Sequence, residues 1–514
     1  MAAHKIRRGH NIPKRMIITA LLLLVQICFI VLIADFITKN VLWTYALFEL
    51  MSIACVVYIV NKRGEQSYKI AWIILILCIP FAGWLFYLIF GGNRMLPHLK
   101  RRYSRYEKES ASYLETQPQV VADLEAYGLL GAKQAKYLKN ESGYPVYDRT
   151  ESEFFPSGET VFASILRDLE LAEKYIFLEF FILAEGFMWD EIHKILSKKV
   201  QNGVEVRVMF DDFGSANRQY KNFVTDLRAE GIHVSVFNPI KPSSNIFLNN
   251  RNHRKIIVID GKIAYTGGFN IADEYINKTH RFGHWLDCGI RLYGSAVKSF
   301  TVMFCNMWNF TCRKSGIQIE NYLSSGFEDS LGTGFVQPYC DGPFDDHRAG
   351  EGIYLQMINS ARKYVSIATP YLIIDNMMID TLVRAAKSGV DVRIICPKHW
   401  DKWYVHPVTQ YHYAELLEAG VRIYEYTPGF IHSKLFVVDD RFATVGTFNM
   451  DYRSFNFHFE CGVWLCNCRT VSDINDHLSK VMEKSEEILE GTWKKRPLML
   501  RFKQTVLHLF APFM

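Results

Sequence analysis

One polar pattern occurs twice in this 514-residue chain, each time on the same apolar frame. The segment RNHRKIIVIDGKIAYTGGFN begins at Arg251, and FIHSKLFVVDDRFATVGTFN begins at Phe430. Both copies place lysine, aspartate, glycine and asparagine at identical intervals after a histidine. The matching residues are His253, Lys255, Asp260, Gly267 and Asn270 in the first copy, and His432, Lys434, Asp439, Gly446 and Asn449 in the second. Such coincident spacing indicates a duplicated folding unit.

Further matched blocks flank the two copies in the same order. AEKYIFLEF pairs with ARKYVSIAT, GVEVRVMF with GVDVRIIC, LRAEGIHVSVFNP with LLEAGVRIYEYTP, and DCGIRL with ECGVWL. Each block combines a helix-length amphipathic stretch with a short apolar strand, and a glycine stands at the helix end as a C-cap signal. The sequence therefore predicts an α/β protein with two homologous lobes, residues 145–330 and 331–490. Each lobe is a helix-flanked sheet, and the two lobes face one another about a pseudo-twofold axis.

Three long apolar runs precede the lobes, at residues 16–37, 41–60 and 70–90. Each run is close to the ~20 residues that a helix needs to cross a bilayer. We therefore expect a multi-pass membrane region with two to three hydrophobic segments over residues 1–95. A basic linker is expected over residues 96–144, and a basic amphipathic segment over residues 491–514.

Basic residues flank the apolar runs on several sides. They precede the first run, occupy the loop after the second, and follow the third. The positive-inside rule would keep all three groups on the cytoplasmic side, which three full crossings cannot satisfy. A re-entrant or kinked segment would satisfy the rule, and Pro80 and Gly83 make the third run a candidate for it, but the sequence leaves the number of crossings open. On this rule we expect the two lobes on the cytoplasmic face of the cell membrane.

The histidine and lysine of each copy can form a reactive site. Residues i and i+2 of a strand share a face, so His253 and Lys255 point to one side, as do His432 and Lys434. Neutral imidazole can attack phosphorus, while a second imidazole protonates the leaving oxygen. Lysines neutralise the charge on the phosphate oxygens. This inventory favours phosphoryl transfer.

Four carboxylates are duplicated near these histidines. Asp260 and Asp439 fall where a strand turns, so turn chemistry alone explains them and favours a structural role. Asp287 and Glu460 have no local turn to explain them. A catalytic imidazole needs a carboxylate to fix its tautomer. We therefore predict that Asp287 and Glu460 orient the histidines across the lobe interface.

No metal or cofactor is expected. The 11 cysteines are irregularly spaced, and the chain contains no CxxC pair or His/Cys cluster in sequence. Two lysines can supply the positive charge that a metal ion supplies in other phosphoryl-transfer sites.

These motifs resemble the phospholipase D superfamily, whose signature is His-x-Lys-x4-Asp followed by Gly and Asn, twice per active site. The finer resemblance is to bacterial cardiolipin synthases. It is carried by NNRNHRKIIVIDGKIAYTGGFNIADEY, WLDCGIRL, QPYCDGP, ATPYLIID, GFIHSKLFVVDD and the N-terminal PFAGWLFYLIFGGNR. The resemblance covers the chain from about residue 40 to its end.

The resemblance implies that two phosphatidylglycerol molecules give cardiolipin and glycerol through a phosphatidyl-histidine intermediate. His253, in the first lobe, would be the nucleophile, and His432 the general acid and base. Phosphate oxygens would be held by Lys255, Lys434, Asn270 and Asn449, and the family motif adds Asp260 and Asp439 to the catalytic set. The implied partners are phosphatidylglycerol and anionic membrane lipid, without nucleic acid. The sequence leaves a homo-oligomer open.

Two departures from the family pattern stand out. The chain has a third apolar run where cardiolipin synthases commonly have two segments, and the first copy has Gly267-Gly268 where the family often has Gly-Ser. The C-terminal WKKRPLMLRFKQTVLHLFAPFM mixes basic and bulky apolar residues. Such a segment either lies in the membrane interface or packs as a helix on the second lobe.

Other functions remain open at this stage. The same histidines can pass the phosphatidyl group to water or to another alcohol, as a membrane phospholipase D would. A nucleic-acid phosphodiesterase has a compatible site, but the apolar runs argue against it. A non-enzymatic lipid-binding scaffold would carry degenerate motifs, whereas both motifs here are intact.

Overall fold

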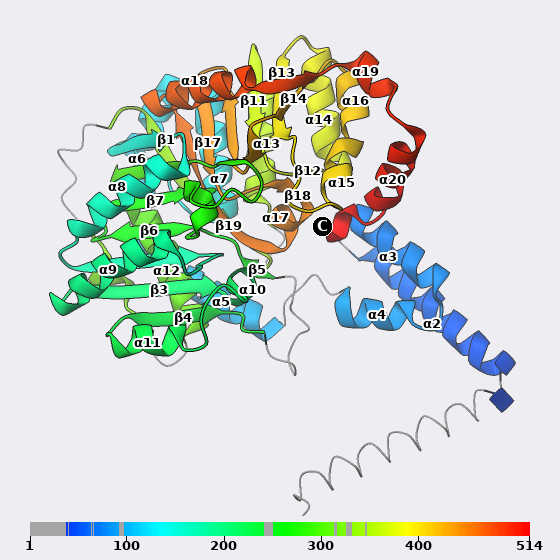
Figure 1. The fold of residues 1–514 in the computed structure, drawn as a ribbon, viewed down its shortest axis with the longest axis horizontal. Coiled ribbons are helices and arrows are strands. Elements are labelled where there is room, and N and C mark those ends of the chain that lie inside the picture. The colour runs from blue at the N-terminus through cyan, green and yellow to red at the C-terminus, as the bar shows by residue number, and fades with distance from the viewer. Residues whose placement is uncertain are drawn as a thin grey trace, which may run out of the picture. The chain divides into compact units, whose positions relative to one another are not determined.

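The computed structural model divides the chain into two compact units, Met1–Gly92 and Asn93–Met514. It describes residues 38–39, 41–62, 64, 66–91, 97–240, 250–312, 316–324, 332–344 and 347–514. Figure 1 shows the chain as a ribbon.

The first unit contains the helices α2 (Val41–Asn61), α3 (Gln66–Cys78) and α4 (Gly83–Phe90). Within the described residues, α2 is the one helix long and apolar enough to cross a membrane. The first apolar run, 16–37, lies outside the described residues. The third run is divided into α3 and α4, and the break contains Pro80, whose carbonyl accepts a hydrogen bond from Ser52 Oγ of α2 at 3.1 Å.

The first lobe is built on a seven-stranded sheet. Its order is β1 (Thr150–Phe155), β9 (Gly289–Gly294), β7 (Ile263–Gly267), β6 (Ile256–Ile259), β2 (Tyr175–Phe180), β3 (Glu205–Asp211) and β4 (His233–Phe237). The pairs β2–β3 and β3–β4 are parallel, and the others are antiparallel.

The second lobe repeats this sheet strand for strand. The order is β10 (Phe335–Asp341), β19 (His458–Cys466), β17 (Phe442–Gly446), β16 (Leu435–Val438), β11 (Tyr364–Ala368), β13 (Asp391–Pro397) and β14 (Arg422–Tyr426), with β20 (Ser485–Ile488) added at the edge. The same neighbours are parallel and antiparallel as in the first lobe. This correspondence confirms the predicted pair of homologous α/β lobes.

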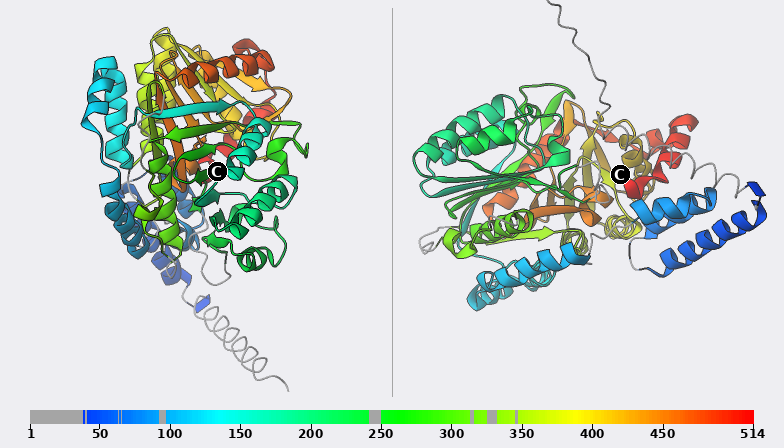
Figure 2. Two further views of the ribbon diagram at one scale, coloured as in Figure 1. Left: turned by 90° about the vertical axis from the view of Figure 1, so that its left-hand side faces the viewer. Right: turned by 90° about the horizontal axis from the view of Figure 1, so that it is seen from below.

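Helices pack against the sheets of both lobes (Figure 2). In the first lobe these are α8 (Gly158–Glu170), α9 (Phe187–Gln201), α11 (Phe223–Ala229) and α12 (Val297–Thr311), and in the second α13 (Ala349–Ser360), α14 (Asn376–Lys387), α16 (Tyr413–Glu418) and α18 (Arg469–Glu483). The predicted C-cap glycines Gly203, Gly231, Gly389 and Gly420 all have positive φ, between 85° and 92°. Glycine adopts this conformation without the cost that a Cβ would impose.

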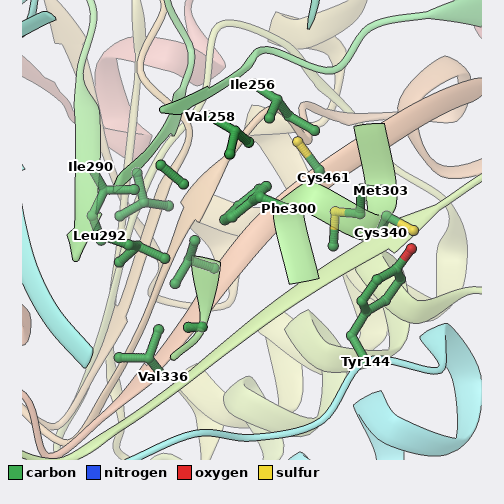
Figure 3. Close-up of a cluster of buried hydrophobic side chains, with 14 of the residues drawn as sticks. Tyr144, Ile256, Val258, Ile290, Leu292, Phe300, Met303, Val336, Cys340 and Cys461 are labelled. Atoms are coloured by element: carbon green, nitrogen blue, oxygen red, sulfur yellow. The ribbon is translucent and has the colours of Figure 1, made fainter. Parts of the chain in front are cut away.

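The two lobes share one hydrophobic core. It combines Ile256 and Val258 of β6 with Val336 of β10 and Cys461 of β19, and α12 is buried along nearly its whole length beside them (Figure 3). Two further clusters fill the outer layers of the first and second lobes. Because the central core draws on both sheets, the lobes form one packed body rather than two tethered domains.

The region predicted as a basic linker, 96–144, is instead helical and packed. It forms α5 (Pro97–Ser110), α6 (Pro118–Tyr127) and α7 (Leu129–Ser142). The ring of Tyr103 contacts Phe310 of the first lobe and Phe459 of the second. Gln134 accepts a hydrogen bond from Trp464 Nε1 at 2.9 Å. Between the basic residues, apolar positions at helical spacing pack these helices against the lobes, which is the difference from the predicted linker.

Candidate active site

Each histidine lies at the end of a short strand that pairs with the opposite lobe. Strand β5 (Arg251–Asn252) runs parallel to β19, and β15 (Gly429–Ile431) runs parallel to β8 (His284–Leu286). The backbone N–H of His253 donates to the Phe459 carbonyl at 2.9 Å, and that of His432 to the Leu286 carbonyl at 2.7 Å. The strand that ends at each histidine thus pairs with a strand of the other lobe. This pairing brings each histidine beside a carboxylate of the other lobe.

Two cross-lobe pairs of histidine and carboxylate result. His253 Nδ1 lies 2.9 Å from both carboxylate oxygens of Glu460, and His432 Nδ1 lies 2.6 Å from Asp287 Oδ2. Both carboxylates are fully buried. A carboxylate accepts hydrogen bonds, so each Nδ1 carries the proton and each Nε2 keeps its lone pair for reaction. Each carboxylate thus contacts the histidine of the other lobe, where the sequence predicts an orienting role for it.

The two pairs differ in how the backbone accommodates the carboxylate. A Cβ added at Gly268 would lie 2.0 Å from Asp287 Oδ1, so the shorter aspartate requires glycine there. In the second copy the matching position is Thr447, and its hydroxyl donates to Glu460 Oε2. Glycine at position 268 therefore leaves room for the Asp287 carboxylate in its observed place. In the second copy, the hydroxyl at this position contacts the carboxylate.

The lysines lie beside their own histidines and are buried. Lys255 Nζ donates to the His253 carbonyl at 2.6 Å, and Lys434 Nζ donates to the His432 carbonyl. Arg254, between His253 and Lys255, points to the other side of the strand and forms a buried ion pair with Glu179 at 2.7 Å. This alternation places the imidazole and the ammonium of each copy on one face, as expected from strand geometry.

Burial lowers the pKa of all four basic groups, and repulsion from neighbouring cations adds to the effect for His253, His432 and Lys255. Burial, followed by the charges of Lys255 and Lys434, lowers the pKa of His253 well below its usual 6.5. Burial lowers the pKa of His432 to about 4 and of Lys255 to about 7. The pKa of Lys434 falls to about 8 for the same reason. A site that concentrates positive charge in this way is built to receive an anion.

The turn aspartates lie away from the histidines. Asp260 accepts hydrogen bonds from the backbone N–H groups of Glu173, Lys174 and Tyr175, each at 2.8 Å. Asp439 does the same with residues 362–364 at 2.7–2.9 Å. Each follows a four-residue strand, which rises about 13 Å. These contacts favour a structural role for both aspartates, as their turn positions do, and the catalytic role that the family motif implies for them stays a prediction.

The two asparagines have different surroundings. Asn270 Oδ1 accepts from the Ile182 N–H at 3.0 Å, and its Nδ2 donates to Tyr275 Oη at 2.7 Å. The Tyr275 ring lies 5.6 Å from that of His432, so Asn270 reaches the site through this tyrosine. Asn449 is 5% exposed, and among the described residues none donates to its Oδ1. The carbonyl oxygen of the Asn449 side chain thus has no donor among the described residues, whereas Asn270 is fixed by protein contacts at both ends of its amide.

Sequence reasoning missed a third histidine. His458 precedes Glu460 by two residues; its Nδ1 lies 3.6 Å from Glu460 Oε1, and its ring lies 5.5 Å from that of His253. Its Nε2 accepts from Arg453 Nε at 3.3 Å. The matching residue in the first lobe is Trp285, whose ring lies 5.2 Å from His432. Comparing residue types at matched positions of the repeat would have revealed this asymmetry.

The ligand-type atoms of His253, His458 and Glu460 lie within 4.8 Å of one another. Sequence spacing could not show this group, because two of its members are about two hundred residues from the third. Lys255 and Lys434 already place positive charge around His253, and Arg453 bonds the third histidine. A cation would have to compete with these charges, so we interpret the group as an extension of the hydrogen-bonded support of His253.

The chain matches the family model described as "Cardiolipin synthase, PLD-like domain" over residues 165–308 and 354–483, and the model "Phospholipase_D-nuclease N-terminal" over 50–92. It is 39% identical over 90% of its length to an uncharacterized protein of Streptococcus mutans serotype c, of which it covers 100%. It is 33% identical over 90% of its length to a cardiolipin synthase of Alkalihalophilus pseudofirmus, of which it covers 92%.

Among solved structures, a phosphatidylserine synthase of Haemophilus influenzae superposes with a TM-score of 0.54 at 14% identity, over 74% of this chain and 98% of that one. This likeness supports the fold. The family model covers both lobes, the two intact motifs converge at one site, and the similar proteins match nearly from end to end. The chain therefore belongs to the cardiolipin synthase family of phospholipase D-like proteins, and it is a phosphatidyltransferase.

Proposed function

We propose that the protein transfers a phosphatidyl group between two phosphatidylglycerol molecules and gives cardiolipin and glycerol. The observation that carries this proposal is the pair of cross-lobe contacts, His253 with Glu460 and His432 with Asp287. They place one imidazole from each lobe, in equivalent orientations, at one anion-binding site. That arrangement suits a double displacement, in which one imidazole bonds to phosphorus while the other moves the proton.

In the first step, His253 Nε2 attacks the phosphorus of a phosphatidylglycerol, and the bond from phosphorus to the glycerol oxygen breaks. His432 Nε2, which takes up a proton from solvent when the anionic substrate binds, donates that proton to the glycerol oxygen, and glycerol leaves. The phosphodiester anion itself makes this step accessible, because its charge offsets Lys255 and Lys434 and so raises the pKa of His432 above its value in the empty site. Glu460 stabilises the positive charge that forms on His253.

In the second step, a terminal hydroxyl of another phosphatidylglycerol attacks the phosphatidyl-histidine. His432, now neutral, accepts the hydroxyl proton, and the bond from phosphorus to His253 breaks. Cardiolipin leaves and both histidines return to their starting states. The ammonium groups of Lys255 and Lys434, with the amide of Asn449, stabilise the phosphate oxygens in both transition states.

The N-terminal unit supports a membrane location for this chemistry. The apolar helix α2 is long enough to span a bilayer, and the substrate is a membrane lipid. We propose a multi-pass protein of the cell membrane whose lobes lie on the cytoplasmic face, because the basic residues that flank the apolar runs favour that side.

The test is reconstitution of the purified full chain with phosphatidylglycerol as the sole phospholipid. Mass spectrometry should find cardiolipin and glycerol in equal amounts, and a His253→Ala preparation should form neither. Phosphatidic acid as the main product would contradict the transferase proposal and indicate a hydrolase. Cardiolipin formation only after another lipid is added would show that the phosphatidyl donor is not phosphatidylglycerol.

The pKa values predict the pH dependence of the reaction. Lys255 and Lys434, with pKa values of about 7 and about 8, carry charge below those values and lose it as pH rises. The nucleophile His253 stays neutral throughout, because its pKa is lowered well below 6.5. We therefore expect kcat/KM for phosphatidylglycerol to fall as pH rises from 7 through 8, with no acid limb near 6.5.

The alkaline limb of kcat should lie at higher pH than that of kcat/KM, because a bound anion raises the pKa of both lysines. Lys262→Gln, at an exposed turn of the first lobe, is the control and should keep the wild-type profile. A kcat/KM that rises between pH 7 and 9 would contradict the assignment of the lysines as the charged phosphate-binding groups.

A further inference from the structure

The C-terminal helix of the second lobe has its apolar face turned outward. In α20 (Leu498–His508) Gln504 is fully buried, whereas Leu498 is 79% exposed, Met499 76% and Phe502 67%. Val506, Leu509 and Phe510 continue the exposed apolar face. A helix that packs on a soluble protein normally shows the reverse polarity. Figure 1 shows α20 in red at the edge of the second lobe.

A neighbouring loop extends this apolar face. Between β13 and α15 (His406–Tyr411), Trp400 is 52% exposed and Trp403 56%. Lys503 Nζ of α20 lies 5.4 Å from the centre of the Trp403 ring and joins the two elements. Beneath them, Val405 and Val408 pack with Leu507 and Ala511, so the helix is held firmly on the lobe. We call this surface the docking surface; it consists of Trp400, Trp403, Tyr404, Leu498, Met499, Phe502, Val506, Leu509 and Phe510.

The charged side chains of the C-terminal helix and its flanking residues are all basic. Residues 494–514 include five basic side chains and no acidic one. Lys495 and Lys503 are exposed, and Lys402 is exposed in the tryptophan loop. Aromatic rings beside lysines on an exposed apolar face match the interface of an anionic bilayer, where rings lie at headgroup depth and ammonium groups contact phosphate.

The docking surface is connected to the active site. Lys402 Nζ donates to Tyr371 Oη at 3.1 Å, and its charge contributes to the lowered pKa of His253. Beyond α20, the carbonyl of Phe513 accepts from Arg453 Nη1 at 3.3 Å, and Arg453 also bonds His458. The loop and the residues after the helix therefore contact side chains that lie beside the active site.

We propose that the docking surface inserts into the interface of a bilayer that contains anionic phospholipid, and so holds the mouth of the active site against the membrane. The proposal rests on the proposed function for the identity of the lipid substrate. It adds a second membrane contact, in the catalytic unit, to the apolar helices of the N-terminal unit. A surface of nine exposed apolar side chains would otherwise remain in water, which monomeric soluble proteins rarely tolerate.

Tryptophan fluorescence tests this contact without reference to activity. The full chain is placed in nanodiscs that contain phosphatidylglycerol, with either plain lipids or lipids brominated near the headgroup. The emission lost on Trp400→Phe with Trp403→Phe is the emission of these two residues. We expect the brominated lipids to quench at least about half of it, because rings at the interface lie within 5–10 Å of the headgroup boundary.

Trp189→Phe is the matched control, because Trp189 is buried in the first lobe and its emission should be the same in both lipids. Equal emission of Trp400 and Trp403 in plain and brominated lipids would overturn the proposal. So would emission that changes with protein concentration alone, since the surface would then contact a second copy. These outcomes are independent of whether cardiolipin forms.

Activity provides the second test. Trp403→Ser with Phe502→Ser should lower the rate on phosphatidylglycerol in bilayers by about tenfold or more, because the fraction of lobes held at the membrane falls. The rate on a water-soluble, short-chain phosphatidylglycerol should stay within about twofold of the wild type. Leu171→Ser, at an equally exposed leucine of the first lobe, is the control for both rates. Equal losses on the two substrates would contradict a docking role.

Discussion

We expect replacement of either His253 or His432 by alanine to abolish phosphatidyl transfer, and the double variant to be scarcely slower than either single variant. We expect each single substitution to lower kcat by at least roughly ten thousandfold, as in other sites whose groups act as one unit. The reason is geometric. His253 alone can form a bond to phosphorus, but without a proton for the leaving oxygen the step stalls. His432 alone can move a proton, but it has no displacement to assist.

The measurement is the initial rate of cardiolipin formation from phosphatidylglycerol for the wild type, the two single variants and the double variant. His233→Ala, at the exposed start of β4, serves as the control for loss of a histidine and should keep full activity. Each histidine is buried against the other lobe, so its replacement can affect folding. Circular dichroism and the unfolding temperature of each variant are therefore measured together with its rate. A rate within about tenfold of the wild type in either single variant would contradict the paired mechanism. Tenfold corresponds to ~1.4 kcal/mol of activation barrier.

The cross-lobe pairing of histidine and carboxylate could be predicted because the duplication constrains it. A block that recurs in the same order twice must fold twice, and two copies of one strand end meet only if the lobes face each other. Asp287 and Glu460 stood out because no turn explained them. Their fully buried carboxylates now lie on the histidines of the opposite lobe.

Features that arise from packing between distant elements could not be predicted. His458 is close to His253 only because β5 pairs with β19 across the interface. Lys402 reaches the site from a loop whose sequence carries no motif. The sequence of helices α5 to α7 resembles a linker because many basic residues interrupt its apolar positions. The apolar side chains are nevertheless the ones that these helices bury. Periodicity indicates which face of a helix is apolar, but not which surface receives that face.

His253 and His432 have different proposed roles. The second prediction with a large effect distinguishes the nucleophile from the general acid. We expect a phosphatidyl ester of an electron-poor phenol to rescue His432→Ala by about a hundredfold or more relative to phosphatidylglycerol, and not to rescue His253→Ala. General acid catalysis contributes in proportion to the basicity of the leaving oxygen, and a good leaving group needs no proton. A missing nucleophile cannot be compensated by the leaving group. Release of the phenol, followed by absorbance, measures both rates directly.

The covalent intermediate provides the complementary evidence. Rapid denaturation without acid, followed by peptide mass spectrometry, should place the phosphatidyl group on the peptide that contains His253, since a bond from phosphorus to imidazole is acid-labile. In His432→Ala with the phenol ester, the label should accumulate, because no base remains to activate the acceptor hydroxyl. A label on His432 in the wild type would exchange the two roles and leave the reaction unchanged. Rescue of both alanine variants by the phenol ester, with no label on either peptide, would instead indicate direct attack of the acceptor on phosphorus. The cross-lobe carboxylates would then serve two proton-transfer groups, and neither histidine would be a nucleophile.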